Sequence, residues 1–423
     1  MNKVYKIALL IFLYLQIIFV SINFVPLVYC QTNGGSWRYE IQSTSISAGS
    51  NDIDISDDGN YIIAGNVNKI YFFHRNQSTP IWIYETDYIV HSVSISSNGS
   101  LAAACTGNGT IYCFKTLDYT NDVKPFWYYS VDNMMHIVDI SSDGRVVVAG
   151  GEDQGIFLFN NTNLNYQFSK STFTPLHVYL TSAPIYTLDI SSDGKYVIVG
   201  ANNEVILLNG TNLDFLWKHV AGSMDIIRVT ISDNGFYMAA SSYDGYIYFF
   251  NYTSSIPEWN VSTSGYFRGI DISGDGEYLV AVSSSYSRFH FFNRSSSQPE
   301  WVYNAYAEHG KSVAISYNGL YFAAGVQNIT SSRFDRVLYF NTSETTPKLE
   351  LNVPAQTEIS LDISADGRFI AVKSGLYISL YDVLDPFIAS TSGTISLFLV
   401  PGLIISIGIV FIKMLQINRK RQL

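Results

Sequence analysis

From residue 52 to residue 383, hydrophobic and polar positions follow one scheme that recurs along the chain. Each unit opens with Ile-Ser-x-(Asp/Asn)-Gly, continues into a short apolar run, passes a polar turn and enters a second run that ends on an aromatic residue or Leu. An Asp-Gly or Asn-Gly pair between apolar runs is typical of a tight turn joining antiparallel strands, because glycine readily adopts the positive φ that such a turn needs. The phrase begins at Ile55, Ile95, Ile140, Ile190, Ile231, Ile272, Ile315 and Ile363.

A fourth strand is predicted just upstream of each phrase, where all six tryptophans fall. In four units a proline stands two residues before the tryptophan, and a missing N–H is tolerated only at the start of a strand or on a sheet edge. The tryptophan strand is therefore predicted to be the outermost of its sheet. The slot holds Trp37, Trp82, Trp127, Trp217, Trp259 and Trp301, with His177 and Leu349 near it in the other two units.

Eight units of four strands predict an all-β fold, an eight-bladed β-propeller over residues 36–383. The turn glycines recur every 40 to 50 residues, which is the period of a propeller blade. A ring of small sheets leaves no long exposed edge. The chain has a tryptophan strand at 36–42 before the first unit and ends its last unit on a third strand at 377–383. The N-terminal strand is therefore expected to close the last blade.

Uncharged apolar stretches at both ends predict hydrophobic helices, since a bilayer core needs roughly 20 such residues. The second stretch is followed by Lys413, Arg419, Lys420 and Arg421, the flank that stays on the cytoplasmic side. The propeller is therefore expected outside the cytoplasm, at the cell membrane. The expected segments are a signal peptide or N-terminal membrane anchor (1–30), a tether (384–393), a transmembrane helix (394–414) and a basic cytoplasmic tail (415–423).

Charge narrows the range of partners. Residues 31–393 carry 19 basic and 35 acidic side chains, a balance that repels nucleic acid and anionic lipid. Sequons for N-glycosylation agree with export, although Asn, Ser and Thr are also common in turns. They begin at Asn76, Asn98, Asn108, Asn160, Asn209, Asn251, Asn260, Asn293, Asn328 and Asn341.

The order of strand, Ser-x-Asp-Gly turn, small-residue strand, turn and aromatic-ended strand resembles the WD-repeat family of propellers over residues 36–383. Most units lack the Gly-His start, and none ends its third strand in Trp-Asp. The "PxWxY" outer strand is instead similar to the repeats of quinoprotein-type propellers, which bind pyrroloquinoline quinone. That resemblance would imply an adjacent cysteine pair, which the chain lacks, so no cofactor is expected.

Carboxylates on the first strands are the weak candidates for a metal site. Asp54, Asp139, Asp189, Asp271 and Asp362 each stand two residues before the Ser of the phrase. On the innermost strands they could form a ring around the central channel and collect a cation such as Ca²⁺, which favours oxygen ligands. The alternative is that each carboxylate accepts hydrogen bonds within its own turn.

Cys105 lies at the end of one predicted strand, and Cys113 lies near the end of the next strand of the same hairpin. They could pair across the ladder as a disulfide, which export permits, or stay as two small buried thiols. The seven histidines show no metal-ligand spacing, and no nucleophile elbow or phosphate-binding loop occurs. No catalytic residue is therefore predicted.

One inter-strand segment, residues 325–337, is longer than its counterparts and predicts a long loop, the kind of element that binds partners on a rigid scaffold. The expected function is a non-catalytic cell-surface interaction or structural module that binds a protein or glycan through the loops of one propeller face. The alternative is a quinoprotein-like propeller enzyme, or a cofactor or metal binder, that uses the central channel.

Overall fold

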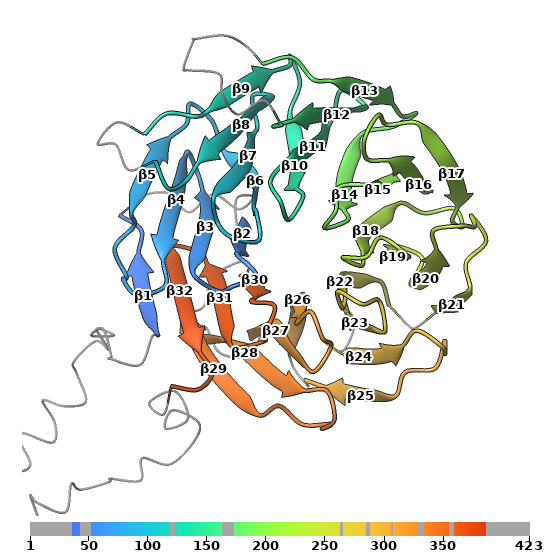
Figure 1. Cartoon of the computed structure of the whole chain (residues 1–423). Helices are drawn as coiled ribbons and strands as arrows, with labels where there is room; N and C mark the ends of the chain where they lie inside the picture. Colours follow the sequence, from blue (N-terminus) through green and yellow to red (C-terminus); the bar gives the residue numbers. More distant parts are fainter. Residues whose placement is uncertain are drawn as a thin grey trace, which may run out of the picture.

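The first strand of every unit lies innermost in a ring of eight antiparallel four-stranded sheets (Figure 1). The structure is a computed structural model, and it describes residues 36–42, 52–118, 123–162, 173–262, 265–284, 288–305, 308–328, 334–354 and 359–385. All regular elements in these ranges are strands. The predicted eight-bladed β-propeller is confirmed. The predicted terminal helices, tether and cytoplasmic tail lie almost entirely outside the described residues, and within those residues no helix is long and apolar enough to cross a bilayer.

Blades 1 to 4 follow the chain in order, each running from its inner strand to its outer strand. Their strands are β2 (Asp52–Ile55), β3 (Tyr61–Asn66), β4 (Lys69–His74) and β5 (Trp82–Glu85); β6 (Val90–Ile95), β7 (Leu101–Thr106), β8 (Thr110–Lys115) and β9 (Trp127–Ser130); β10 (Met135–Ile140), β11 (Val146–Gly151), β12 (Gly155–Asn160) and β13 (His177–Leu180); and β14 (Ile185–Ile190), β15 (Tyr196–Ala201), β16 (Glu204–Asn209) and β17 (Phe215–Val220).

Blades 5 to 7 repeat this order, and blade 8 takes its outer strand from the other end of the domain. Their strands are β18 (Ile226–Ile231), β19 (Tyr237–Ser242), β20 (Tyr246–Asn251) and β21 (Trp259–Ser262); β22 (Phe267–Ile272), β23 (Tyr278–Ser283), β24 (Arg288–Asn293) and β25 (Trp301–Asn304); β26 (Glu308–Ile315), β27 (Tyr321–Asn328), β28 (Phe334–Asn341) and β29 (Leu349–Pro354); and β30 (Ile359–Ile363), β31 (Phe369–Ser374), β32 (Tyr377–Asp382) and β1 (Trp37–Glu40).

The ring is closed by β1, which pairs antiparallel with β32 in the register Trp37 to Leu380. Two further hydrogen bonds extend this pairing, from Ile41 N–H to Leu376 O (2.7 Å) and from Asp382 N–H to the Ser36 hydroxyl (3.0 Å). Figure 1 shows the two strands side by side although they come from opposite ends of the domain. The predicted closure of the last blade by an N-terminal strand is confirmed, so separating any two blades must open a closed circle.

The repeated phrase builds the same turn in each blade. In blade 1, the Ser56 hydroxyl donates to Asp58 Oδ1 (2.7 Å) and accepts the Tyr61 N–H (3.0 Å). Gly59 has φ of +66°, and a Cβ there would lie 2.5 Å from the ring of Phe369 in blade 8. Glycine is therefore required twice, once by the backbone conformation and once by the close approach of the preceding blade.

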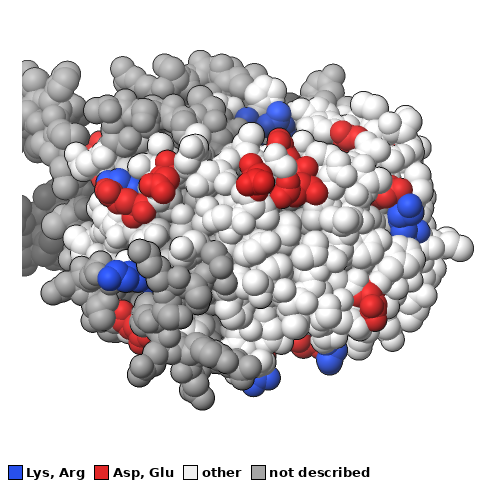
Figure 2. All heavy atoms as spheres, turned by 90° about the horizontal axis from the view of Figure 1, so that it is seen from above, with Lys and Arg blue, Asp and Glu red and all other residues white. Residues whose placement is uncertain are grey.

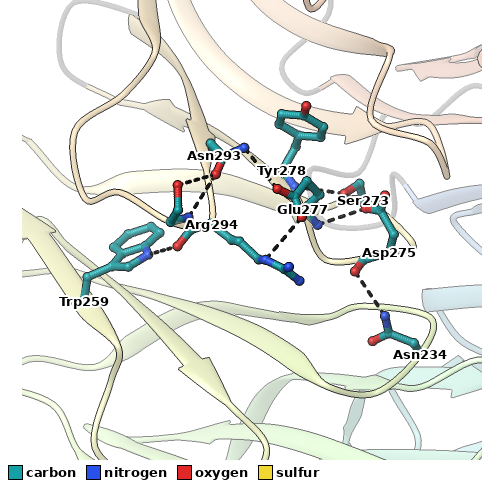
Figure 3. Close-up of polar contacts among 9 residues, drawn as sticks. Asn234, Trp259, Ser273, Asp275, Glu277, Tyr278, Asn293 and Arg294 are labelled. Atoms are coloured by element: carbon teal, nitrogen blue, oxygen red, sulfur yellow. Dashed lines mark hydrogen bonds and ion pairs between the residues drawn. The ribbon is translucent and has the colours of Figure 1, made fainter.

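The tryptophans of the outer strands reach across to the next blade. Trp259 Nε1 donates to the carbonyl oxygen of Arg294 (2.6 Å), as drawn in Figure 3, and Trp37 Nε1 donates in the same way to Arg75 (2.7 Å). At the junction in Figure 3, Arg294 also forms an ion pair with Glu277 (3.2 Å), and Asn234 Nδ2 donates to the Asp275 carbonyl (3.1 Å). The tryptophan that recurs in the outer strands thus joins its blade to the next.

Where a long loop was predicted at 325–337, the described residues 325–328 and 334–337 extend two strands, because Gly325 pairs with Val337 and Val326 with Arg336 in the same ladder. Residues 329–333 lie outside the described part of the chain. β26, β27 and β28 each have eight residues, against six in most first, second and third strands. Alternating apolar and polar residues such as Val326 and Gln327 continue the strand pattern, which is why the additional residues lengthen blade 7.

Candidate binding site at one mouth of the central channel

Carboxylates of the first strands line the channel and bridge neighbouring blades. Asp54 Oδ2 accepts the Ile95 N–H (2.8 Å), Asp189 Oδ2 accepts the Ile231 N–H (2.8 Å) and Asp271 Oδ2 accepts the Ile315 N–H (2.8 Å). Asp362 and Asp139 accept the N–H of Ile55 and Ile190 in the same way (3.1 and 3.0 Å). An innermost strand has an edge with no strand beside it, so its N–H groups need such partners. The carboxylates supply them.

In two blades a hydroxyl side chain replaces the Asp of the first strand, and it also bonds to the next blade. Blades 2 and 5 have Ser94 and Thr230 there, and these donate to the carboxylates of Asp139 (2.8 Å) and Asp271 (3.4 Å) in the following blades. The alternative of local hydrogen bonds holds in part, because Asp139, Asp189 and Asp271 each accept the N–H of the next residue (2.8, 2.8 and 2.9 Å) in addition to a donor in the following blade. Among the described residues, no three Asp, Glu, His or Cys side chains are placed to hold a metal ion.

Burial raises the pKa of the channel carboxyls. The pKa of Asp271 rises to about 7, and those of Asp54 and Asp189 rise well above the usual range, with the neighbouring carboxylates Asp362 and Asp139 as the next cause. The backbone N–H donors act in the opposite direction because they favour the ionised form. Asp271 is therefore only partly ionised at neutral pH, and burial shifts the pKa of Asp54 and Asp189 in the same direction.

At the mouth where the first strands end, here called the turn mouth, backbone groups satisfy one another. In one run, Ser97 N–H donates to Ser142 O, Ser142 to Ser192 and Ser192 to Asp233 (3.0, 3.1 and 3.1 Å). In a second run, Gly274 donates to Tyr317, Tyr317 to Ala365 and Ala365 to Asp57 (2.9, 3.1 and 3.0 Å). The cavity inside this belt measures about 250 Å³, and its lining contains acidic side chains but no Lys or Arg.

At the opposite mouth, six consecutive blades have a β-bulge in the first strand. In each of these strands, the register of pairing with the second strand skips one residue. Bulges occur frequently beside functional sites because they redirect a side chain. We call these residues the bulge ring, and their entrance the bulge mouth. The bulge ring consists of His91, His136, Tyr186, Ile227, Arg268 and Lys311.

Half of the bulge ring is aromatic. The imidazoles of His91 and His136 meet edge to face with ring centroids 5.6 Å apart, and His136 lies 4.7 Å from Tyr186. Burial lowers the pKa of both histidines. At neutral pH this side of the mouth is therefore an uncharged arc of rings from blades 2, 3 and 4.

The other half of the bulge ring, Ile227 with the two cations Arg268 and Lys311, lines the larger cavity. The cavity measures about 630 Å³, and its lining includes Arg228 and the bulge residues Arg268 and Lys311 from blades 5, 6 and 7. Tyr186, Tyr243 and Tyr266 provide aromatic walls, and Asp225 is the one carboxylate in the lining. Arg268 Nη2 donates to the Tyr266 hydroxyl (3.2 Å), which lowers the pKa of Tyr266 and orients the guanidinium.

The structure corrects the proposed disulfide. Cys105 and Cys113 are free and buried. Their strands pair in a register that sets Cys105 opposite Ile111 and Cys113 opposite Ala103, so the two cysteines stand diagonally and not as a direct pair. Burial raises the pKa of Cys113 to about 12 and raises that of Cys105 as well, so both thiols are unreactive at neutral pH.

Five of the predicted sequons form turns at the end of a third strand. In these, the Asn side-chain oxygen accepts the N–H of the Ser or Thr two residues later, as between Asn209 and Thr211 (2.8 Å). The other four are Asn160, Asn251, Asn293 and Asn341. Of the remaining sequons, Asn76, Asn98 and Asn260 are exposed and Asn108 is half-buried, whereas the side chain of Asn328 lies outside the described part of the chain. In the tight turn of blade 2, Asn98 Oδ1 accepts the Ser100 N–H (3.0 Å) in the same way. A structural turn thus accounts for six of the ten sequons.

The ring of four-stranded blades defines the class of protein as a β-propeller. Residues 78–115 match the family described as WD domain, G-beta repeat. This segment covers β5 of blade 1 and β6 to β8 of blade 2, so one sequence repeat straddles two blades, and the same offset leaves β1 to complete blade 8. The match and the eight blades together support a WD-repeat propeller. Curated proteins searched with this sequence gave no significant match.

Sequence reasoning missed the bulge ring. Its signal is present in the sequence. The residue three before the Asp slot changes from His to Tyr, Ile, Arg and Lys between units, while its neighbours, apart from Arg228, are apolar or small. A variable position in a repeat that is otherwise uniform indicates an element that the scaffold does not need.

Proposed function

We propose that this protein is a non-catalytic interaction module at the cell surface, and that it binds a partner protein at the bulge mouth. The observation that carries this proposal is the bulge ring. In six blades, side chains such as Tyr186 and Arg268 are redirected to one entrance although the scaffold does not use them. WD-type propellers commonly act as scaffolds for protein interactions, which agrees with such a role.

The two mouths differ in a way that favours this assignment. At the turn mouth, backbone groups bond to one another and the carboxylates bond to neighbouring blades. Few polar groups there remain available to bind a partner. The bulge mouth has the larger cavity, with exposed Tyr186 and Tyr243 (54% and 49%) in its lining. Amphipathic tyrosines are favourable contact residues in protein interfaces because they bury a large area at a small cost in conformational entropy.

The location outside the cytoplasm rests on the uncharged segments at both ends and on the cationic flank that follows the second. A transmembrane helix at 394–414 would anchor the propeller, and the acidic balance of residues 31–393 suits a soluble ectodomain. The cell membrane is therefore the compartment that we propose.

A cysteine at the bulge mouth tests both parts of the proposal. In the full chain on intact cells, Tyr186→Cys is labelled with a membrane-impermeant maleimide that carries a photoreactive group. We expect labelling without permeabilisation and a discrete cross-linked species after illumination. The native Cys105 and Cys113 give little background because they are buried.

Tyr317→Cys is the matched control, since Tyr317 is similarly exposed (51%) but lies at the turn mouth. It should be labelled without yielding the cross-linked species. Labelling that requires permeabilised cells would contradict the surface location. Labelling without a cross-link at Tyr186, or an identical cross-link at both positions, would contradict binding at the bulge mouth.

A further inference from the structure

We infer that the bulge mouth recognises a short segment of the partner protein that carries clustered carboxylates, held between Arg228, Arg268 and Lys311. This inference rests on the proposed function and specifies the chemistry of the partner. Three cations from adjacent blades line one cavity of about 630 Å³ together with a single carboxylate, Asp225.

The cation cluster opposes the charge of the rest of the domain. Residues 31–393 carry 35 acidic and 19 basic side chains, and on the face seen in Figure 2 the acidic groups gather in compact patches. The turn mouth, at the other end of the same channel, has acidic side chains and no Lys or Arg in its lining. An anionic group is therefore favoured at the bulge mouth over the turn mouth, which offers it no cationic side chain.

The arginines keep their capacity for an anionic ligand. In the described part of the chain, no carboxylate lies within ion-pair distance of Arg228 or Arg268, and both side chains are exposed. Arg268 is oriented by its hydrogen bond to the Tyr266 hydroxyl, and its guanidinium carbon lies 5.7 Å from the centre of that ring. A guanidinium can bind a carboxylate through two parallel hydrogen bonds, and an oriented one loses less freedom on binding.

Shape and charge favour a peptide over a sulfated glycan. A long polyanion needs a basic surface along its whole length, whereas here the cations lie on one arc of a single cavity and the surroundings are acidic. A short peptide places carboxylates on that arc alone. It can also set an apolar or aromatic side chain against Tyr186 and Ile227, which line the same cavity.

The test uses a fluorescein-labelled octapeptide with four glutamates around a central tyrosine, and its counterpart with glutamine in place of glutamate. Binding to the full chain in detergent is followed by fluorescence anisotropy. We expect the glutamate peptide to bind, with an affinity that falls as salt is raised, and the glutamine peptide to bind at least about tenfold more weakly, as expected when hydrogen bonds to a charged group are lost.

Charge reversal identifies the cations. Arg228→Glu and Arg268→Glu should each weaken binding of the glutamate peptide at least about tenfold, and Arg268→Gln should weaken it less. Arg145→Glu is the matched control, because Arg145 is an exposed arginine (68% of its side chain) in a turn on the opposite face. It should leave binding unchanged.

Several results would overturn the inference. These are no binding of the glutamate peptide, equal binding of both peptides, or equal losses in the Arg145 and Arg268 variants. Stronger binding of a heparin hexasaccharide, with the same dependence on Arg268, would replace the peptide by a glycan. A cross-link at Tyr186 that survives both charge reversals overturns this inference alone, whereas absence of that cross-link overturns the proposed function itself.

Discussion

Replacing Trp37 by alanine is expected to lower the free energy of unfolding of the propeller by about 3 to 5 kcal/mol, the usual cost of removing a buried tryptophan side chain. Trp37 is 3% exposed and packs with Phe73 of blade 1, while its own strand belongs to blade 8. The change also leaves the Arg75 carbonyl without its indole donor. Because Trp37 lies in the strand that completes blade 8 and packs on blade 1, its loss weakens the junction where the ring closes.

Chemical denaturation followed by tryptophan fluorescence and circular dichroism would measure the effect. His177→Ala is the control, because His177 occupies the corresponding slot in blade 3, away from the seam, and is only half-buried. The account requires a clearly larger loss for the Trp37 variant. Equal losses in the two variants would mean that closure by β1 contributes little to the stability of the ring.

Replacing Asp271 by asparagine is expected to change how stability depends on pH. Burial raises the pKa of Asp271 from its usual 3.8 to about 7 in the folded protein, so the folded state holds a proton that the unfolded state releases. The stabilising contribution of the protonated carboxyl is complete below about pH 4 and is lost as the pH rises towards 7. Asparagine stays neutral at every pH, so the variant does not lose stability through this group as the pH rises.

We therefore expect the Asp271→Asn variant to gain about 2 kcal/mol relative to the wild-type protein between pH 4.5 and pH 7.5, roughly half of what the full pKa shift would give, because water reaches the channel. Thermal unfolding at a series of pH values would measure the difference. Asp58→Asn is the control, a change that the repeat itself makes at Asn98, Asn234 and Asn318. A difference for Asp271→Asn that stays constant across this range would contradict the assignment.

Sequence reasoning predicted the blades because their determinants are local. The Asp-Gly turn and the alternation of apolar positions act within a few residues, and the surplus of one tryptophan strand at the start, around Trp37, predicted the closure. The two ends of the segment 325–337 were assigned wrongly as loop, because strand extension depends on the register between Gly325 and Val337, which the pattern did not include.

Contacts between blades were the part that local reasoning could not supply. Asp189 accepts the N–H of the next residue, Ile190, as local reasoning expected, but its second partner, Ile231, stands 42 residues away along the chain. The bulge ring was missed because a single additional residue, such as Arg268, leaves the apolar pattern intact while it changes the direction of one side chain. Long-range register and single-residue insertions are therefore where this sequence is least informative.

Hydrogen exchange of the full chain, measured by mass spectrometry with and without the partner captured at Tyr186, tests the central claim most directly. Binding at the bulge mouth predicts slower exchange in peptides from the starts of β14, β18, β22 and β26, which hold the residues that line the cavity. Exchange in the turns around Gly59, Gly235 and Gly319 should stay the same. Protection confined to those turns, or to the outer strands, would contradict the proposed site.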